Sequence, residues 1–102
     1  FWYITVVGTG NTPSGTIGFQ GLTIQTTVNN GSAWTSAALS YVDTVDQNPF
    51  RWSHTINTIF DCTATATHKV RFNYSPEDSN SQLSGAAGYM LTGFTFIRLG
   101  DT

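Results

Sequence analysis

The sequence lacks any helical hydrophobic period, and this absence most constrains what the chain can fold into. No segment carries apolar residues at positions i, i+3, i+4 and i+7 over the length of a helix, whereas β-branched and aromatic residues recur in short runs separated by Gly, Asn, Pro and Ser. About seven or eight such runs fit into the 102 residues. We therefore predict an all-β fold, either a jelly roll or a β-sandwich of about seven to eight antiparallel strands.

A hairpin around Asn30-Gly31 is the best-defined local element. In residues 22–28, Leu22 and Ile24 alternate with polar Thr and Gln, as in a strand that is buried on one face. Asn-Gly is the dipeptide best suited to a type I′ turn, because both central residues of that turn need a positive φ. Residues 33–42 should therefore return antiparallel to the first strand.

The remaining strands follow from alternation and from the turn residues between them. Residues 68–74 place an apolar face opposite a face that carries Lys69 and Arg71, so these cations should face water. Residues 1–7 and 88–99 are apolar on both faces, which predicts cover on both sides and a C-terminal strand away from any solvent edge. Further strands are predicted at residues 16–28 and 50–60, with loops at residues 8–15, 43–49 and 75–85.

The length predicts a single domain over residues 1–102, since domains cluster at about 100 to 150 residues. The chain begins with Phe1 in a predicted strand, so we expect a domain excised from a longer polypeptide. Cys62 is the single cysteine and excludes an internal disulfide framework. Small domains without disulfides commonly gain stability from oligomerisation, and self-association is therefore a prediction.

Charged residues make up only 10% of the chain, against roughly 25% in typical soluble domains. Thr, Ser, Asn and Gln together account for 37 of the 102 residues. The formal net charge is -2 and the four cations are scattered, so no basic stripe is present to bind nucleic acid. No apolar run reaches the roughly 18 residues that cross a bilayer, so we predict no membrane insertion. An uncharged polar surface loses little solvation free energy on contact, which favours a protein that binds another surface.

Few residues offer catalytic chemistry. Ser53 and His54 are adjacent, so on a strand they point to opposite faces and cannot act together as nucleophile and base. A glycosidase needs two carboxylates roughly 5 to 9 Å apart. The available acids fall in predicted loops, where carboxylates are normally solvated; they are Asp43, Asp46, Glu77 and Asp78. We predict that the chain is not an enzyme and requires no cofactor.

The same region holds the candidate metal ligands. Glu77, Asp78 and Asn80 carry oxygen ligands of the kind that bind a hard cation such as calcium, but their spacing does not match an EF-hand. Cys62 has no second cysteine or histidine at metal-binding spacing and fits a small buried residue. No metal site is predicted.

Aromatic rings are the better candidates for a binding surface. Trp52 shares its predicted face with other large apolar residues and fits the core, whereas Trp34 follows the predicted turn among Ser, Thr and Ala, and Tyr41 lies beside the next loop. Amphipathic rings beside amides and hydroxyls are typical of sugar and protein sites, so Trp34 and Tyr41 are the predicted ligand-binding residues. The predicted oligomer-interface residues come from the two strands with two apolar faces; they are Trp2, Ile4, Phe94 and Phe96.

The C-terminal half resembles a known class of domain. Residues 88–101, Gly-Tyr-Met-Leu-Thr-Gly-Phe-Thr-Phe-Ile-Arg-Leu-Gly-Asp, resemble the closing strand of small head domains on bacteriophage tail fibres and related virion proteins. Residues 68–74 resemble the strand that precedes it. The resemblance implies a trimeric jelly roll similar to that of tumour necrosis factor, placed at the tip of a fibre. It also implies attachment rather than chemistry, at the virion surface or outside the cell.

These observations predict a non-catalytic viral fibre or virion head domain that assembles as a homotrimer and attaches to a host-surface glycan or receptor protein. A carbohydrate-binding module of a larger secreted enzyme would share the aromatic rings and the low charge, but it would be monomeric. A structural jelly-roll subunit of a capsid would differ from the fibre head mainly in symmetry. A hydrolase that uses the loop carboxylates is the remaining hypothesis.

Overall fold

The regular secondary structure of the described residues consists of β-strands. The computed structural model describes residues 1–12, 18–44 and 50–101, and this part of the chain holds seven strands and no helix. The strands are β1 (Trp2–Thr12), β2 (Gly18–Thr27), β3 (Thr35–Thr44), β4 (Phe50–Phe60), β5 (Lys69–Pro76), β6 (Gln82–Leu83) and β7 (Gly93–Arg98). The prediction of an all-β fold with about seven strands is confirmed. Within the described ranges, no helix is long and apolar enough to cross a membrane.

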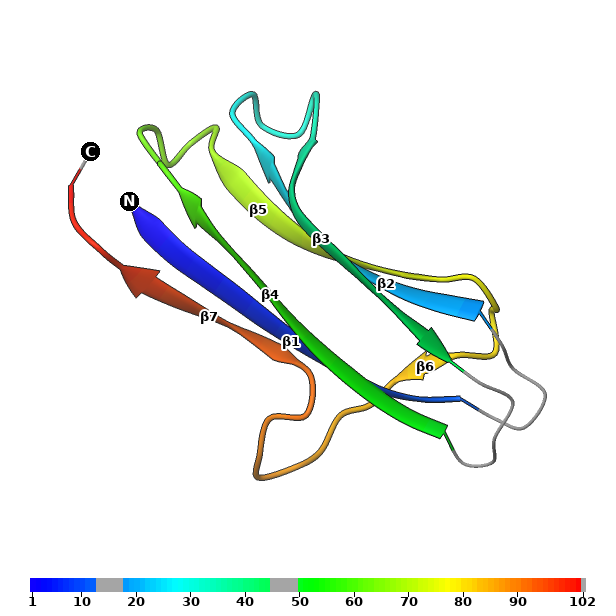
Figure 1. Cartoon of the computed structure of the whole chain (residues 1–102). Helices are drawn as coiled ribbons and strands as arrows, with labels where there is room; N and C mark the ends of the chain where they lie inside the picture. The colour runs from blue at the N-terminus through cyan, green and yellow to red at the C-terminus, as the bar shows by residue number, and fades with distance from the viewer. Residues whose placement is uncertain (13–17, 45–49, 102) are drawn as a thin grey trace.

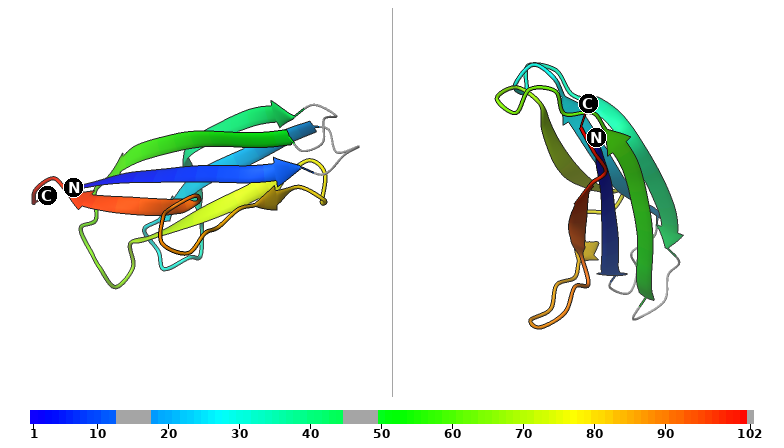
Figure 2. Two further views of the ribbon diagram at one scale, coloured as in Figure 1. Left: turned by 90° about the horizontal axis from the view of Figure 1, so that it is seen from below. Right: turned by 90° about the vertical axis from the view of Figure 1, so that its left-hand side faces the viewer.

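Two antiparallel sheets pack face to face (Figures 1 and 2). In sheet A, β1 lies between β4 on one edge and both β7 and β6 on the other. In sheet B, β2 lies between β3 and β5. The two chain ends lie together at one end of the molecule (Figure 1), where the Phe1 amino group donates a hydrogen bond to the Gly100 carbonyl at 2.7 Å.

The core fills the space between the sheets. Its central cluster of buried side chains is aliphatic and comes from three strands; the members are Ile4 and Val6 of β1, Leu22 and Ile24 of β2, and Ile56 of β4. Burying a side chain of this size contributes about 1.5–3 kcal/mol. Because side chains alternate along a strand, each sheet has one face on this core and one outer face.

Strand β1 continues through a stretch that the sequence predicted as a loop. Residues 8–12 pair with β4, so the predicted loop at residues 8–15 is wrong for these residues, and residues 13–15 lie outside the described ranges. Glycine suits positions 8 and 10 of this strand because a large neighbouring side chain lies at or close to the place that a Cβ would take. A Cβ on Gly10 would overlap the Trp52 ring, and a Cβ on Gly8 would lie 3.0 Å from Cδ2 of Leu22.

The predicted hairpin is confirmed by the antiparallel pairing of β2 and β3. Asn30 has a φ of 59° and Gly31 a φ of 88°, as the Asn-Gly turn requires. The connection is longer than a two-residue turn, because β2 ends at Thr27. The Thr27 hydroxyl accepts hydrogen bonds from the backbone N–H groups of Asn29 and Gly31, and the Asn29 side chain accepts one from Ala33.

The position of β7 corrects a second prediction. We expected residues 88–99 to form a strand away from the solvent edge, but β7 is shorter and, within the described part of the chain, pairs only with β1. It is therefore an edge strand of sheet A. Phe94 and Phe96 face the core side of the sheet, yet they remain 56% and 41% exposed because only the edge of sheet B lies opposite them.

Two other predicted loops also contain strand residues. Asp43 belongs to β3, whereas residues 45–49 lie outside the described ranges. In the predicted loop at residues 75–85, β5 runs on to Pro76 and β6 pairs with β1. The cause is long-range pairing, which the polar composition of these segments does not reveal. The predicted strand over residues 50–60 is confirmed as β4, and the alternation of residues 68–74 is confirmed in β5.

Candidate functional site

A β-bulge places the two predicted binding rings on one surface. Trp34 and Tyr41 are seven positions apart, so an unbroken strand would turn them to opposite faces. The β2–β3 register shifts, however: Ile24 pairs with Ala38, whereas Gln25 pairs with Ser36. The residue between these partners is the extra residue of the bulge. It turns Trp34 to the side of sheet B that faces away from the core, which we call the outer face and on which Tyr41 also lies.

Tyr41 is the more exposed of the two rings, at 59% of its surface. It lies over Gly21, where a Cβ would be 3.0 Å from the ring. Phe19 supports it from the side in an edge-to-face contact with the ring centroids 5.1 Å apart. Strand β2 thus provides a flat seat for the ring, and most of the phenol is available to a ligand.

Trp34 is partly buried and shares its ring face with a cation. The guanidinium carbon of Arg71 lies 4.2 Å from the centre of the indole. Arg71 Nε donates a hydrogen bond to Gln25 Oε1 at 2.7 Å, and Asn73 Nδ2 donates to the same oxygen at 2.9 Å. The indole edge lies beside Gly31. Trp34, which directly precedes β3, and Arg71 of β5 are therefore in contact, and Gln25 of β2 holds the guanidinium in place.

The residues between the two rings combine apolar and amide groups. Leu39 of β3 is half-exposed on the outer face, and Thr23 of β2 lies next to it in the register. Gln25 also contacts the Ser36 hydroxyl, at 3.5 Å. The outer face thus runs from an arginine stacked on tryptophan, past amides and an aliphatic side chain, to an exposed tyrosine. Such a surface is typical of sugar and protein binding.

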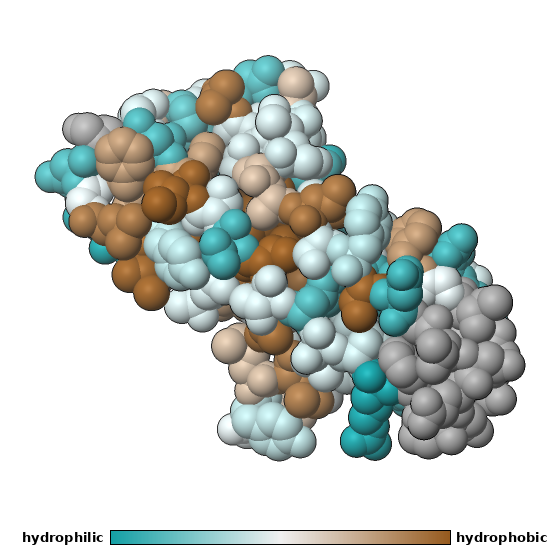
Figure 3. Space-filling model, in the orientation of Figure 1, coloured by the Kyte–Doolittle hydropathy of each residue, from teal (hydrophilic) through white to brown (hydrophobic). Residues whose placement is uncertain are grey.

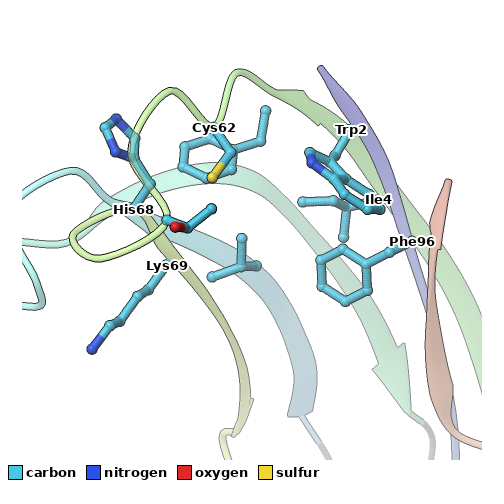
Figure 4. A pocket seen from close by; sticks show the side chains of 9 residues that line it. Trp2, Ile4, Cys62, His68, Lys69 and Phe96 are labelled. Carbon is cyan, nitrogen blue, oxygen red and sulfur yellow. The ribbon is translucent and has the colours of Figure 1, made fainter. Parts of the chain in front are cut away.

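A cavity of about 450 Å³ opens between the sheets near the chain ends (Figure 4). Trp2, Ile4 and Phe96 line it on one side, and Cys62 lies on the other. Three of the four predicted interface residues are thus gathered at one place, and the fourth, Phe94, stacks on Phe72 of β5 with the centroids 4.7 Å apart. Ile4 is fully buried within the chain, so it has no surface to offer to another copy.

A buried polar group that the sequence did not predict lies towards the opposite end of the sandwich. Gln20 is fully buried; its Nε2 donates to the Ser81 hydroxyl at 2.8 Å, and its Oε1 accepts from the Tyr74 hydroxyl at 2.5 Å. Burial raises the pKa of Tyr74, against a smaller lowering by Ser81. Each partner of Gln20 comes from a different segment of the chain, so no local pattern could have indicated their contact.

Two rings beside this group carry polar atoms without a partner in the described structure. They are the indole nitrogen of Trp52 and both ring nitrogens of His54. Trp52 stacks on Tyr74 and meets His54 edge to face, with centroids 5.8 and 5.5 Å apart. Burial lowers the pKa of His54. As predicted, His54 shares the aromatic face and the exposed Ser53 lies on the other side of β4.

The acids do not form a buried pair in the described structure. Asp43 and Glu77 are exposed and flank Phe19 on either side of β2, and one Glu77 oxygen accepts a hydrogen bond from the Phe19 backbone N–H at 3.1 Å. Asp78 caps its own turn by accepting a hydrogen bond from the Asn80 N–H at 2.9 Å. Asp46 lies outside the described residues. No cluster of three metal-ligating His, Cys, Asp or Glu side chains occurs among the residues that are described.

The surface carries the uncharged character of the sequence. On the face seen in Figure 3, pale and brown residues cover much of the surface and strongly hydrophilic residues are scattered between them. No family model, curated protein or solved structure matches this chain. The resemblance to virion head domains therefore stays a prediction, and the function has to be argued from the site itself.

Proposed function

We propose that this domain is a non-catalytic attachment module whose binding surface is the outer face of sheet B. The observation that carries the proposal is the bulge in β3, which brings Trp34 and Tyr41 to one face on either side of a row of amides. A ligand laid along β2 would meet both rings. The proposed role is recognition without a chemical reaction: the acids at Phe19 are exposed, and one of them accepts a hydrogen bond from the backbone.

The ligand in this proposal is a glycan or a protein on a host surface, and the module acts as the head of a viral fibre or of another virion protein. Low charge supports this role, because Thr, Asn and Gln lose less solvation free energy than charged side chains when a partner covers them. Between its two charged ends the outer face carries rings, hydroxyls and amides, so these groups would make most of the contact.

Self-association is the second part of the proposal. Phe94, Phe96 and Ile97 of edge strand β7 are all about half exposed, and the unpaired edge offers backbone hydrogen-bonding groups. We assign this strand, together with Trp2, to the contact between copies in a homotrimer. Light scattering should give three times the mass of the chain, and Phe94→Ser with Phe96→Ser should give a folded monomer. A monomeric wild-type domain would refute the homotrimer and would favour the alternative hypothesis, a carbohydrate-binding module of a secreted enzyme.

Binding is tested by retention of the labelled domain on a panel of immobilised neutral and acidic polysaccharides. Truncating a central aromatic of a binding surface typically costs about 2 kcal/mol or more, so Tyr41→Ala should weaken retention by about 30-fold. Tyr89→Ala is the matched control, because Tyr89 is 67% exposed and belongs to the connection between β6 and β7, two strands of sheet A. Equal retention of both variants and the wild type, or retention of none of them, would contradict binding of glycans at the outer face.

A further inference from the structure

The outer face of sheet B carries positive charges at one end and negative charges at the other. Lys69 and Arg71 lie on β5 at the end that carries Trp34. Asp43 and Glu77 lie at the other end, on either side of Phe19. Gln25, which pairs with Arg71, lies six positions from Phe19 along β2, and this corresponds to about 20 Å. The Debye length is about 8 Å at physiological ionic strength, so the two ends act on a ligand as separate charges.

Arg71 is arranged to receive an anion. Its guanidinium is stacked 4.2 Å above the Trp34 ring and its Nε is held by Gln25, so its orientation is fixed before any ligand arrives. Among the described residues, the one ion pair joins Arg98 and Asp101, and no carboxylate lies within ion-pair distance of Arg71. The Arg71 side chain is exposed, which leaves its terminal nitrogens open to solvent. A planar, pre-oriented guanidinium matches a carboxylate, which it can bind through two parallel hydrogen bonds.

Lys69 adds a second positive charge at the same end. It pairs with Thr27 on the outer-face side of β5, two residues from Arg71. Its aliphatic stem contributes to the wall of the cavity between the sheets, whereas its ammonium group points away from that cavity (Figure 4). The Trp34 end of the outer face therefore carries two cations and the Tyr41 end two acids.

We propose, on the basis of the function proposed above, that the ligand is an acidic glycan in which a carboxylate-bearing sugar alternates with neutral sugars. The carboxylate lies at Arg71 and Lys69, and a neutral ring lies on Tyr41. Asp43 and Glu77 repel carboxylates at that end, so affinity falls as more of the sugars that reach it carry a carboxylate. A polymer made only of uronic acids would place an anion against these acids and bind less tightly.

The test measures affinity for hyaluronan and gellan, whose uronic acids alternate with neutral sugars, and for the same polymers with their carboxylates reduced to alcohols. Alginate tests an all-uronate chain, and dextran sulfate tests a sulfated one. We expect reduction of the carboxylates to weaken binding at least tenfold. Arg71→Gln should remove this preference, Lys69→Gln should reduce it without touching Trp34, and Arg51→Gln, an exposed arginine of β4, should leave it unchanged.

Each outcome decides between the two proposals. Equal affinity for the acidic and reduced polymers, with Tyr41→Ala still weakening both, would overturn the acidic ligand and leave the binding surface in place. Affinity for dextran sulfate equal to that for hyaluronan would overturn the carboxylate in favour of unselective charge attraction. An alginate affinity equal to that of hyaluronan would overturn the repulsion of carboxylates by Asp43 and Glu77. Loss of all binding in the wild type would refute both the ligand and the glycan-binding function.

Discussion

Replacing Gly10 by alanine should remove a large part of the domain's free energy of unfolding. A Cβ at this position would overlap the Trp52 ring and lie 2.6 Å from the backbone carbonyl oxygen of Gln82. The carbonyl belongs to β6 and cannot rotate away. The ring is 4% exposed and is held by its stacking on Tyr74, so it cannot yield without disturbing the buried polar group around Gln20. The methyl group therefore has no space on either side.

Two responses bound the size of the effect. A ring that stays in place under strain costs about 3 kcal/mol, at the upper end of overpacked cores. A ring that is expelled exposes roughly 200 Å² of apolar surface, which costs about 5 kcal/mol at about 25 cal/mol per Å². We expect the free energy of unfolding to fall by about 3–5 kcal/mol, whereas the whole free energy of unfolding of a domain of this kind is about 5–15 kcal/mol. The melting temperature should fall by about 12 °C or more.

Thermal and urea unfolding followed by circular dichroism measure this loss, and two other glycines serve as controls. Gly8→Ala brings a Cβ to 3.0 Å from the flexible end of Leu22, so we expect a loss of about 1 kcal/mol. A Cβ on Gly85 meets nothing within 4 Å, so Gly85→Ala should change stability by less than about 0.5 kcal/mol. A Gly10→Ala protein as stable as Gly85→Ala would show that β1 does not pack against Trp52 as described.

Three further outcomes are expected. Gln20→Leu removes the acceptor of the partly buried Tyr74 hydroxyl and the buried donor to the Ser81 hydroxyl, so it should lower the free energy of unfolding in urea by about 1–3 kcal/mol; Tyr74→Phe in the same protein should restore part of this loss. His54 has a folded-state pKa below its unfolded value, so the unfolded chain binds the proton first as the pH falls. The contribution of His54 to the free energy of unfolding should therefore be constant above about pH 6.5 and decrease below it. His54→Leu should remove this part of the pH dependence. Gly21→Ala would place a Cβ 3.0 Å from the Tyr41 ring and 3.1 Å from the Ser75 carbonyl oxygen, so it should lower the free energy of unfolding by about 1 kcal/mol and weaken polysaccharide retention. Unchanged retention would show that the Tyr41 ring is not part of the binding surface.

The elements that the sequence predicted correctly are those with local causes. The turn at Asn30-Gly31 depends on the φ angles of two residues, and both lie in the positive region. The alternation in residues 68–74 reflects burial of one face of a single strand, and β5 presents Lys69 and Arg71 to solvent as expected. Such signals need no knowledge of the rest of the chain, because a period of two and a preferred turn are properties of neighbouring residues.

The errors arise where the structure depends on distant residues. Gly8 and Gly10 resemble loop residues by composition, yet they pair with β4 as strand residues. Glycine suits these positions because Leu22 and Trp52 lie beside them. Apolar side chains on both faces of the last strand predicted a covered position, but β7 lies at an edge of sheet A. Pairing between strands that are far apart in sequence decides both cases, and composition does not encode which strand will be the neighbour.

The candidate site shows the same division at the level of single residues. Ring type and position in the chain were enough to select Trp34 and Tyr41, but their odd spacing implied opposite faces. Their common face depends on one extra residue in β3, and the surrounding Ser, Thr and Ala residues carry no glycine or other bulge signal. Arg71 was predicted only as a solvated cation, and its contact with Trp34 requires β5 to pair with β2 in the observed register. The bulge that reorients Trp34 thus brings together, from strands whose separate patterns indicate only solvent-exposed faces, the residues of the proposed binding surface.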